Sequence, residues 1–102
     1  MSQFDLYKNA RGGSYPYLLD VQADLLARLA TRAVVPLMTM KRYGAKPISR
    51  LNPTVRIANV EHILLVQELA AIPALELREK VTSLASRRTE IIDALDLLFM
   101  GL

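Results

Sequence analysis

Hydrophobic and polar residues alternate over several short stretches in the first three quarters of the chain, which is typical of β-strands. Residues 3–8 alternate with a period of two, and the aromatic and branched residues of the stretch 15–22 follow after a loop that contains Gly12 and Gly13. We therefore expect a β-hairpin at the start of the sequence. The same criteria predict further short strands over residues 32–38, 54–58, 61–67 and 69–75.

Two connections between these strands differ in length. Residues 23–29 have helical propensity but form too short a stretch for a stable helix of their own, so they predict a turn or an irregular connection. Residues 41–53 contain Gly44, Pro47 and Pro53, and they predict a long loop.

A helix is predicted for the last part of the sequence, because its largely apolar positions recur at steps of three or four. These positions are Val81, Leu84, Arg88, Ile91, Leu95, Leu98 and Leu102. Phe99, Met100 and Leu102 form a dense apolar tip, which we expect to dock on the fold itself, on a second copy or on a partner. Antiparallel strands followed by one helix predict a small α+β or barrel-like domain over residues 1–102.

Length and composition are those of one small domain. The chain has 102 residues, of which 52% are hydrophobic and none is cysteine, so disulfides and thiolate metal sites are excluded. A domain of this size buries only about two thirds of its unfolded surface, so a second copy would add useful burial, and we expect a homodimer. Residues 1–5 lack a signal-peptide pattern, and the apolar run 63–66 is too short to span a bilayer. We therefore expect a cytoplasmic protein.

Charge is distributed unevenly along the sequence. From residue 61 onward seven acidic residues accompany four basic ones, whereas residues 25–60 contain no acid and seven bases. The seven bases are Arg28, Arg32, Lys41, Arg42, Lys46, Arg50 and Arg56. A cationic surface of this kind suits a nucleic acid or an acidic segment of a partner, and scattered charge on a solvated loop also accounts for it.

Residues with catalytic potential are scarce. His62 is the only histidine, and in a strand-like run we expect it to be an ordinary half-buried or exposed side chain. Asp93 and Asp96 lie three residues apart and are expected on the solvent face of the helix. No nucleophile elbow, P-loop or metalloprotease motif is present. The sequence therefore predicts no catalytic residue, no metal site and no cofactor.

Apolar anchors for a binding partner are easier to find. Leu25 and Leu26 are adjacent in the irregular connection, so both cannot easily face one core, and at least one is expected to be exposed. Together with the apolar tip they suit a protein interface, although core packing explains most leucines.

Several segments, taken together, resemble the CcdB family of toxins. The matching positions are residues 3, 4 and 7 and the stretches 20–26, 32–37, 72–73 and 99–102. The most specific pieces are D-V-Q-x-D at 20–24, V-x-P-L at 34–37 and an aromatic-x-Gly-aliphatic run at 99–102. Their order and spacing match over nearly the whole chain.

The resemblance implies a homodimeric SH3-like barrel of antiparallel strands with a long C-terminal helix, from a bacterial type II toxin-antitoxin system. It implies a toxin that is not an enzyme, binds the dimerisation region of the A subunit of DNA gyrase and traps the cleaved gyrase–DNA complex. The implied second partner is a small antitoxin whose disordered C-terminal segment folds on binding. Sequence-specific nucleic-acid binding and membrane binding are not implied.

The family's contact residues can be carried over by position. The implied gyrase-binding residues are Leu25, Leu26, Arg87, Thr89, Ile92, Asp96, Phe99, Met100, Gly101 and Leu102. The implied antitoxin-binding residues are Lys8 and Arg11, in the loop that follows the first strand.

Two positions depart from the family pattern. Met100 stands where the pattern has a tryptophan, and a thioether lacks the cation–π attraction of about 0.5–2 kcal/mol that an indole offers to an arginine. Asp96 stands where the pattern has a neutral amide, and its carboxylate can pair with the same arginine. We expect gyrase binding with altered poisoning.

Two other functions remain open. Toxin endoribonucleases of the MazF and Kid type share the barrel and dimer plan, and the cationic stretch from Arg28 to Arg56 suits RNA. Against them, the matching residues follow the gyrase-poison pattern, and no acid–base set is evident. The other alternative is a non-toxic homologue that binds antitoxin only, which the absence of the tryptophan favours.

Overall fold

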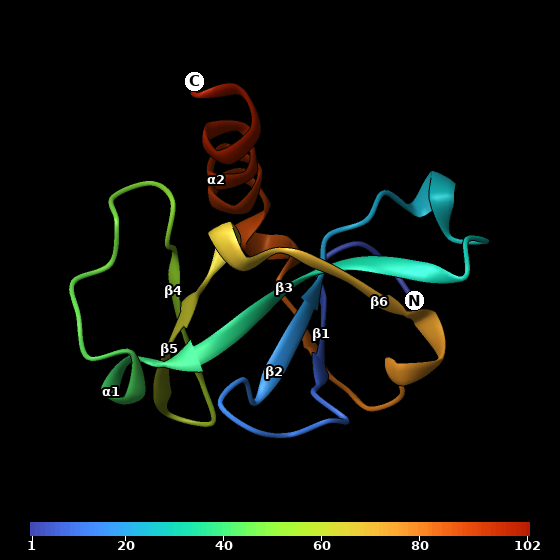
Figure 1. The fold of residues 1–102 in the computed structure, drawn as a ribbon, viewed down its shortest axis with the longest axis horizontal. Helices are drawn as coiled ribbons and strands as arrows, with labels where there is room; N and C mark the ends of the chain where they lie inside the picture. The colour runs from blue at the N-terminus through green and yellow to red at the C-terminus, as the bar shows by residue number, and fades with distance from the viewer.

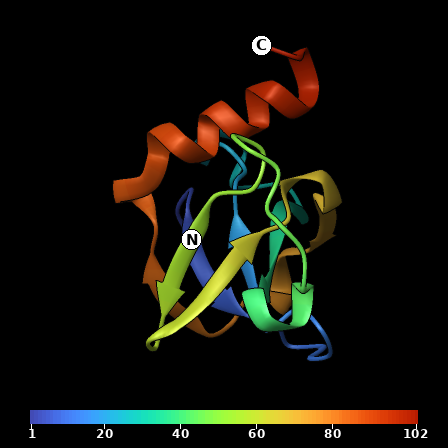
Figure 2. The ribbon, with the colours of Figure 1, turned by 90° about the vertical axis from the view of Figure 1, so that its left-hand side faces the viewer.

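Seven short antiparallel strands form one curled sheet (Figures 1 and 2). The computed structural model describes all residues, 1–102. The strands are β1 (Asp5–Lys8), β2 (Tyr17–Asp20), β3 (Thr31–Thr39), β4 (Thr54–Ile57), β5 (Val60–Leu64), β6 (Ala70–Pro73) and β7 (Lys80–Ser83). Their order in the sheet is β4-β5-β3-β2-β1-β7, with β6 paired to β3. Because β4 and β7 do not pair with each other, the sheet is a half-barrel.

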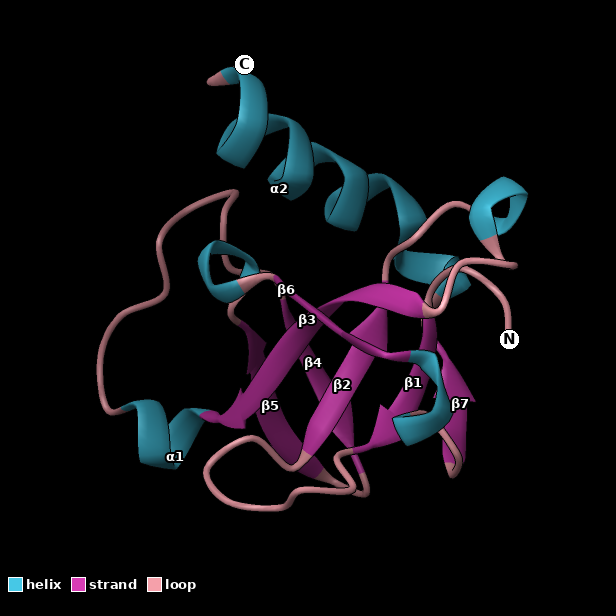
Figure 3. Cartoon of the chain, turned by 45° about the vertical axis from the view of Figure 1, so that its right-hand side comes forward, coloured by secondary structure: helices cyan, strands magenta, loops and turns pink.

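One long helix, α2 (Arg88–Met100), lies across one end of this half-barrel (Figure 3). A single-turn helix, α1 (Met40–Tyr43), follows β3 directly. Four 3-10 turns connect the other elements: η1 (Asp24–Leu26), η2 (Val66–Glu68), η3 (Ala74–Glu76) and η4 (Ala85–Arg87). The predicted mainly β, α+β fold with a C-terminal helix is confirmed.

The central strand β3 accommodates a proline without losing a ladder hydrogen bond. On one side, residues 31–34 pair with β6 and residues 37–39 pair with β5. Pro36 lies where the neighbour changes, and its carbonyl oxygen accepts a hydrogen bond from the Leu65 N–H at 3.0 Å on that side. The nitrogen of a strand residue points to the same side as its carbonyl, so the missing N–H faces the gap between the two ladders.

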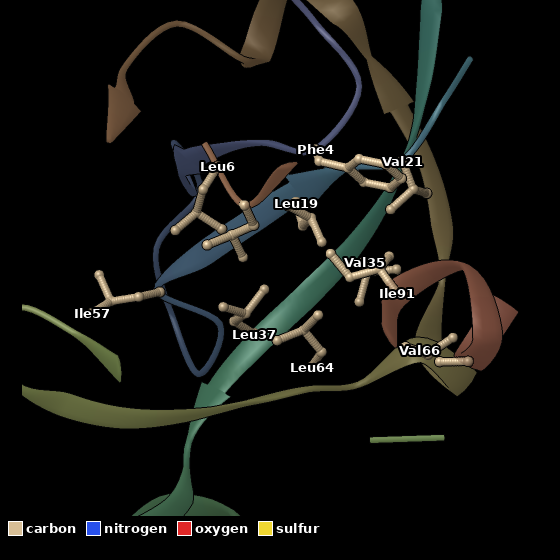
Figure 4. Close-up of a cluster of buried hydrophobic side chains, with 12 residues drawn as sticks. Phe4, Leu6, Leu19, Val21, Val35, Leu37, Ile57, Leu64, Val66 and Ile91 are labelled. Carbon is tan, nitrogen blue, oxygen red and sulfur yellow. The ribbon is translucent and has the colours of Figure 1, made fainter. Parts of the chain in front are cut away.

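Two hydrophobic clusters lie on opposite faces of the sheet. Consecutive residues such as Leu18 and Leu19 belong to different clusters, as the period of two requires. The smaller cluster contains Tyr7, Leu18, Val34 and Leu77. The larger one, which Ile91 and Ala94 of α2 cover, is drawn in Figure 4 and contains Phe4, Leu6, Leu19, Val21, Val35, Leu37, Ile57, Leu64, Val66, Leu84, Ile91 and Ala94.

The helix begins later than the sequence pattern predicts. The prediction that Val81 and Leu84 lie on the helix is wrong, because Val81 belongs to β7 and Leu84 precedes η4. The backbone of β7 pairs with β1, with Ser83 opposite Asp5, and all four residues of β7 are exposed. An exposed strand has no buried face and hence no alternating pattern, so its pairing is set by tertiary structure.

Candidate functional site

The end of α2 presents an exposed apolar tip formed by Phe99, Met100 and Leu102. The exposed fractions of these residues are 65%, 68% and 72%, respectively. Gly101 ends the helix in the left-handed conformation (φ 71°), and its N–H donates to the carbonyl oxygen of Leu97 at 3.1 Å. This arrangement is a left-handed C-cap, which suits glycine because glycine has no Cβ. The apolar tip therefore does not dock on its own chain.

Thr89 and Asp96 are exposed on the outer face of α2, and the half-buried Ile92 lies between them and also packs against the larger hydrophobic cluster. Their spacing of three and four residues places them on one side of the helix, where they line a shallow hollow together with Arg88 and Asp93. Asp96 is exposed and makes no hydrogen bond or ion pair within the chain. Its carboxylate is available to a cation of a partner. These three predicted contact residues thus lie together and lead towards the apolar tip.

Arg87 lies on a different side of the helix start and is already engaged. Its guanidinium donates to both carboxylate oxygens of Glu90, at 2.6 and 2.9 Å, and to the carbonyl oxygen of Thr54 at 2.8 Å. The hydrogen bond with Glu90 raises the pKa of Arg87 and lowers that of Glu90. Arg87 therefore links α2 to β4.

Leu25 and Leu26 are exposed on the turn η1, with exposed fractions of 93% and 47%. Side-chain hydrogen bonds hold this turn to the chain around it. The amide of Gln22 donates to the carbonyl oxygen of Leu26 at 2.9 Å, and Asp24 accepts from the backbone N–H of Gln3 at 2.7 Å. The expectation that at least one of the two leucines is exposed is confirmed.

The turn η1 and the apolar tip do not lie together in one chain. The side chain of Gln3 accepts a hydrogen bond from Arg88 at 3.3 Å, so Gln3, which also contacts Asp24, places η1 beside the first residue of α2. The tip is at the opposite end of this helix (Figure 3). A helical rise of about 1.5 Å per residue separates the two ends by about 18 Å. Among the predicted gyrase-binding residues, the leucines of η1 and the apolar tip therefore lie at opposite ends of α2 in each chain.

Lys8 and Arg11, the predicted antitoxin contacts, both make ion pairs within the chain. Lys8 lies 3.0 Å from the carboxylate of Glu79. Arg11 binds Glu76 through two hydrogen bonds of 2.7 and 2.8 Å. The hydrogen bond to Glu76 raises the pKa of Arg11, and the same contact lowers the pKa of Glu76. An acidic partner segment has to compete with these carboxylates.

The predicted cationic surface is partly neutralised by acids from other parts of the chain. Arg32 is wholly buried and lies 2.5 Å from Asp20, so its assignment to the surface is wrong. Arg50 pairs with Asp93 and Arg56 with Glu61. The bases of this stretch that make no side-chain hydrogen bond or ion pair are Arg28, Lys41, Arg42 and Lys46.

His62 is a packed side chain of β5. It is 3% exposed, which is more buried than the sequence predicts, and its Nδ1 lies 2.8 Å from the carbonyl oxygen of Val60. Its ring meets that of Tyr17 edge-on, at 5.2 Å between centroids.

No three acidic or histidine side chains come together in a way that could hold a metal ion. None of the helices has both the length and the hydropathy needed to cross a membrane.

Comparison with known proteins identifies the family. The sequence model of the family described as CcdB protein matches residues 3–101. The chain belongs to the CcdB family. The structure is also similar to one described as "Crystal structure of Mtb toxin", with a TM-score of 0.66 and 17% sequence identity over 81% of this chain and 91% of that chain. That likeness supports the fold, whereas the family match covers nearly the whole sequence. CcdB proteins are toxins of toxin-antitoxin systems.

The CcdB motif at residues 20–24 has a structural role here. Asp20 binds the buried Arg32 and accepts the N–H of Gln22, while Gln22 accepts the N–H of Ala33 at 3.1 Å. Val21 lies in the larger core cluster. The side chains of this motif thus bind the chain around η1, and the candidate contact residues are the two leucines that follow the motif. Sequence reasoning missed the contacts of Arg50 with Asp93 and Leu102, because these residues lie 43 and 52 positions away in the sequence.

Proposed function

We propose that this protein is the toxin of a type II toxin-antitoxin system and acts by binding the dimerisation region of the A subunit of DNA gyrase. Membership of the CcdB family supports this proposal. The observation that carries it is the apolar tip, formed by Phe99, Met100 and Leu102, which is exposed at the end of a capped helix. Exposed aromatic and sulfur-containing side chains are typical anchors of protein interfaces.

The proposed mechanism needs no catalytic group on the toxin. Gyrase passes through a state in which its bound DNA is cleaved, and a ligand that binds this state better than the closed state shifts the population towards it. Religation then fails and strand breaks accumulate. The outer face of α2 with Asp96 and the apolar tip would supply the differential contacts.

We further propose that the protein acts as a homodimer. In one chain, η1 lies beside the start of α2, whereas the tip lies at the other end of this helix, about 18 Å away along its axis. In a two-fold dimer, a surface of one copy can lie beside a different surface of the other copy. A dimer would therefore allow η1 and the apolar tip to contribute to one gyrase site. Light scattering at several protein concentrations measures the molecular mass that decides this.

An acidic segment of a small antitoxin is proposed to neutralise the toxin. The bases Lys41 and Arg42, together with Lys8 at the end of β1 and Arg11 in the loop that follows, would attract such a segment and accelerate its association. The association rate of the antitoxin peptide should then fall as salt concentration rises. A rate that is independent of salt would contradict this electrostatic contribution.

A gyrase cleavage assay tests the main proposal. The protein is incubated with gyrase, supercoiled DNA and ATP, and the products are examined after detergent and protease, with an RNA sample alongside. We expect linear DNA and intact RNA. Degraded RNA would instead indicate an endoribonuclease, and the absence of both products would indicate a homologue that only binds antitoxin.

Variants of the outer face and of the tip of α2 test where gyrase binds. Replacing Asp96 and Met100 by alanine should weaken binding to the gyrase A fragment, which calorimetry measures directly. Leu75→Ala is the matched control, because Leu75 is 83% exposed but belongs to η3, far from the tip (Figure 1). Equal affinity of the double variant and the unaltered protein would contradict this placement of the site.

A further inference from the structure

In the long loop between α1 and β4, Arg50 is the residue whose side chain forms hydrogen bonds with α2 and the residue after its cap. The Nε and Nη2 atoms of Arg50 donate to the two carboxylate oxygens of Asp93, at 3.1 and 3.2 Å. The Nη2 atom also donates to the backbone carbonyl oxygen of Leu102. A single guanidinium therefore joins the middle of the helix to the residue that follows its glycine cap.

α2 has no basic side chain near its own C-terminal end. The last turn of α2 contains no basic residue, although the negative end of a helix dipole is stabilised by positive charge. Glu90, Asp93 and Asp96 add further negative charge to the same helix. The hydrogen bond with Asp93 raises the pKa of Arg50 and lowers that of Asp93, so the pair stays ionised at neutral pH. The positive charge of Arg50 therefore offsets the negative charge of Asp93 and of the C-terminal end of α2.

The backbone that carries Arg50 is held firmly to the barrel. Asn52 is 5% exposed, and its amide donates to the carbonyl oxygen of Leu64 at 3.0 Å and to the side chain of Gln67 at 2.8 Å. The side-chain oxygen of Asn52 accepts the N–H of Ile48 at 3.0 Å. Arg50 itself has a φ of 68°, a left-handed conformation that non-glycine residues seldom adopt. Such a conformation persists only where its surroundings determine it.

We propose that Arg50 is a positioning residue that fixes the apolar tip of α2 relative to the barrel and so prepares it for its partner. The inference rests on the proposed function in one respect only, namely that the partner of the tip is gyrase. A tip that is already ordered loses less conformational entropy on binding than a frayed one. The loop, anchored at Asn52, transmits the rigidity of the sheet to Leu102 through the Arg50 side chain.

The variant Arg50→Asn tests this inference, because asparagine tolerates the left-handed backbone and carries no charge. Lys46→Asn is the matched control, since it removes the same charge from the same loop and the exposed Lys46 makes no side-chain hydrogen bond or ion pair. The first measurement is amide hydrogen exchange at Gly101, whose N–H is bonded to Leu97. We expect exchange to accelerate about two- to fivefold in Arg50→Asn, the range for an exposed ion pair, and to be unchanged in Lys46→Asn.

Additional measurements separate positioning from a general structural effect. Urea unfolding of Arg50→Asn should be nearly unchanged, whereas its affinity for the gyrase A fragment should fall about two- to fivefold. Adding Asp93→Asn to Arg50→Asn should have little further effect on exchange, because the two residues act together. Unchanged exchange at Gly101 in Arg50→Asn, or equal effects of the Arg50 and Lys46 variants, would overturn the inference. If the unaltered protein does not bind gyrase, the proposed function fails, and the exchange data alone decide whether Arg50 holds the tip.

Discussion

At the scale of single residues, the buried pair of Asp20 and Arg32 is the most consequential interaction of the fold. Neither residue has an exposed side chain, and the Nε and Nη1 atoms of Arg32 have no hydrogen-bond partner. Burying such a pair is unfavourable unless the charges compensate each other, and removing one partner leaves an uncompensated buried charge. The sequence does not reveal this burial, because Asp20 and Arg32 lie on adjacent strands that only the folded sheet brings together.

Replacing Arg32 by methionine should destabilise the protein by about 3–5 kcal/mol, because Asp20 then stays buried without its partner. Urea unfolding followed by circular dichroism measures this loss. Arg56→Met is the control, because the Arg56–Glu61 pair is exposed and spans 3.5 Å. Its loss should change stability by less than about 1 kcal/mol. Equal destabilisation by both substitutions would show that Asp20 does not depend on Arg32.

Met100 determines how strongly the tip can attract a cation. Met100→Trp should increase the affinity for the gyrase A fragment by about 0.5–2 kcal/mol if the partner presents an arginine, because an indole gives a cation–π attraction that a thioether lacks. Calorimetric titration of the two proteins measures the difference. Met100→Leu is the matched control, since it preserves an apolar side chain without an aromatic ring, and it should bind about as well as the unaltered protein.

At the scale of elements, strands that alternate between the two hydrophobic clusters are the ones that the sequence predicts well. Leu18 and Leu19 of β2 face different clusters, and the period of two is visible in their segment. The prediction fails at β7, where Val81 is exposed and no face is buried. The sequence-based prediction also assigns most of α1 to the long loop, because four residues carry too little periodicity to indicate a helix.

The end of α2 depends on the backbone freedom of Gly101. No atom lies within 4 Å of a Cβ built at this position, so Gly101→Ala meets no steric clash and its cost is the left-handed backbone alone. We expect a cost of about 1 kcal/mol, confined to the last helical turn. Amide exchange of the final residues should accelerate while the urea midpoint stays nearly constant. Gly12→Ala is the control, because Gly12 is also left-handed but lies in the loop after β1.

At the scale of the whole molecule, the candidate site combines residues that sequence reasoning locates with contacts that it does not. Helical spacing predicts Asp96 on the solvent face, and the pattern predicts the apolar tip, whereas the assignment of both to the candidate site comes from the resemblance to the CcdB family. Sequence reasoning does not reveal that Glu76 neutralises Arg11 or that Asp93 neutralises Arg50, since these pairs are 65 and 43 residues apart. Linear charge distribution therefore overestimates the cationic surface, because folding brings the acidic last third of the chain against the basic residues.

Stability should fall in acid because carboxylates paired with arginine have to be protonated. The arginine hydrogen bonds lower the pKa of Glu76 and Glu90 below the usual 4.5, and that of Asp93 below the usual 3.8. A group whose pKa is lower in the folded state stabilises it above the unfolded pKa, and this stability is lost as pH falls through the folded pKa. We expect a constant urea midpoint from about pH 7 to about pH 5.5 and a decline towards about pH 3.

A triple variant tests whether these three pairs cause the acid effect. Replacing Glu76 and Glu90 by glutamine and Asp93 by asparagine should reduce the slope of stability against pH below about pH 5, because the groups that titrate are removed. An unchanged slope would assign the acid sensitivity to other carboxylates.

β1 pairs with β7, a strand that is made much later during protein synthesis. The carbonyl oxygen of Phe4 accepts the N–H of Leu84 at 2.8 Å, and Asp5 lies opposite Ser83. β1 thus leaves the ribosome well before β7, so its ladder with β7 is completed only after residues 80–83 have been made, and α2 follows β7. A chain whose translation stops before residue 80 lacks the edge strand β7 and α2 with its apolar tip. Under the proposed function, a chain could therefore bind gyrase only after β7 and α2 have been synthesised.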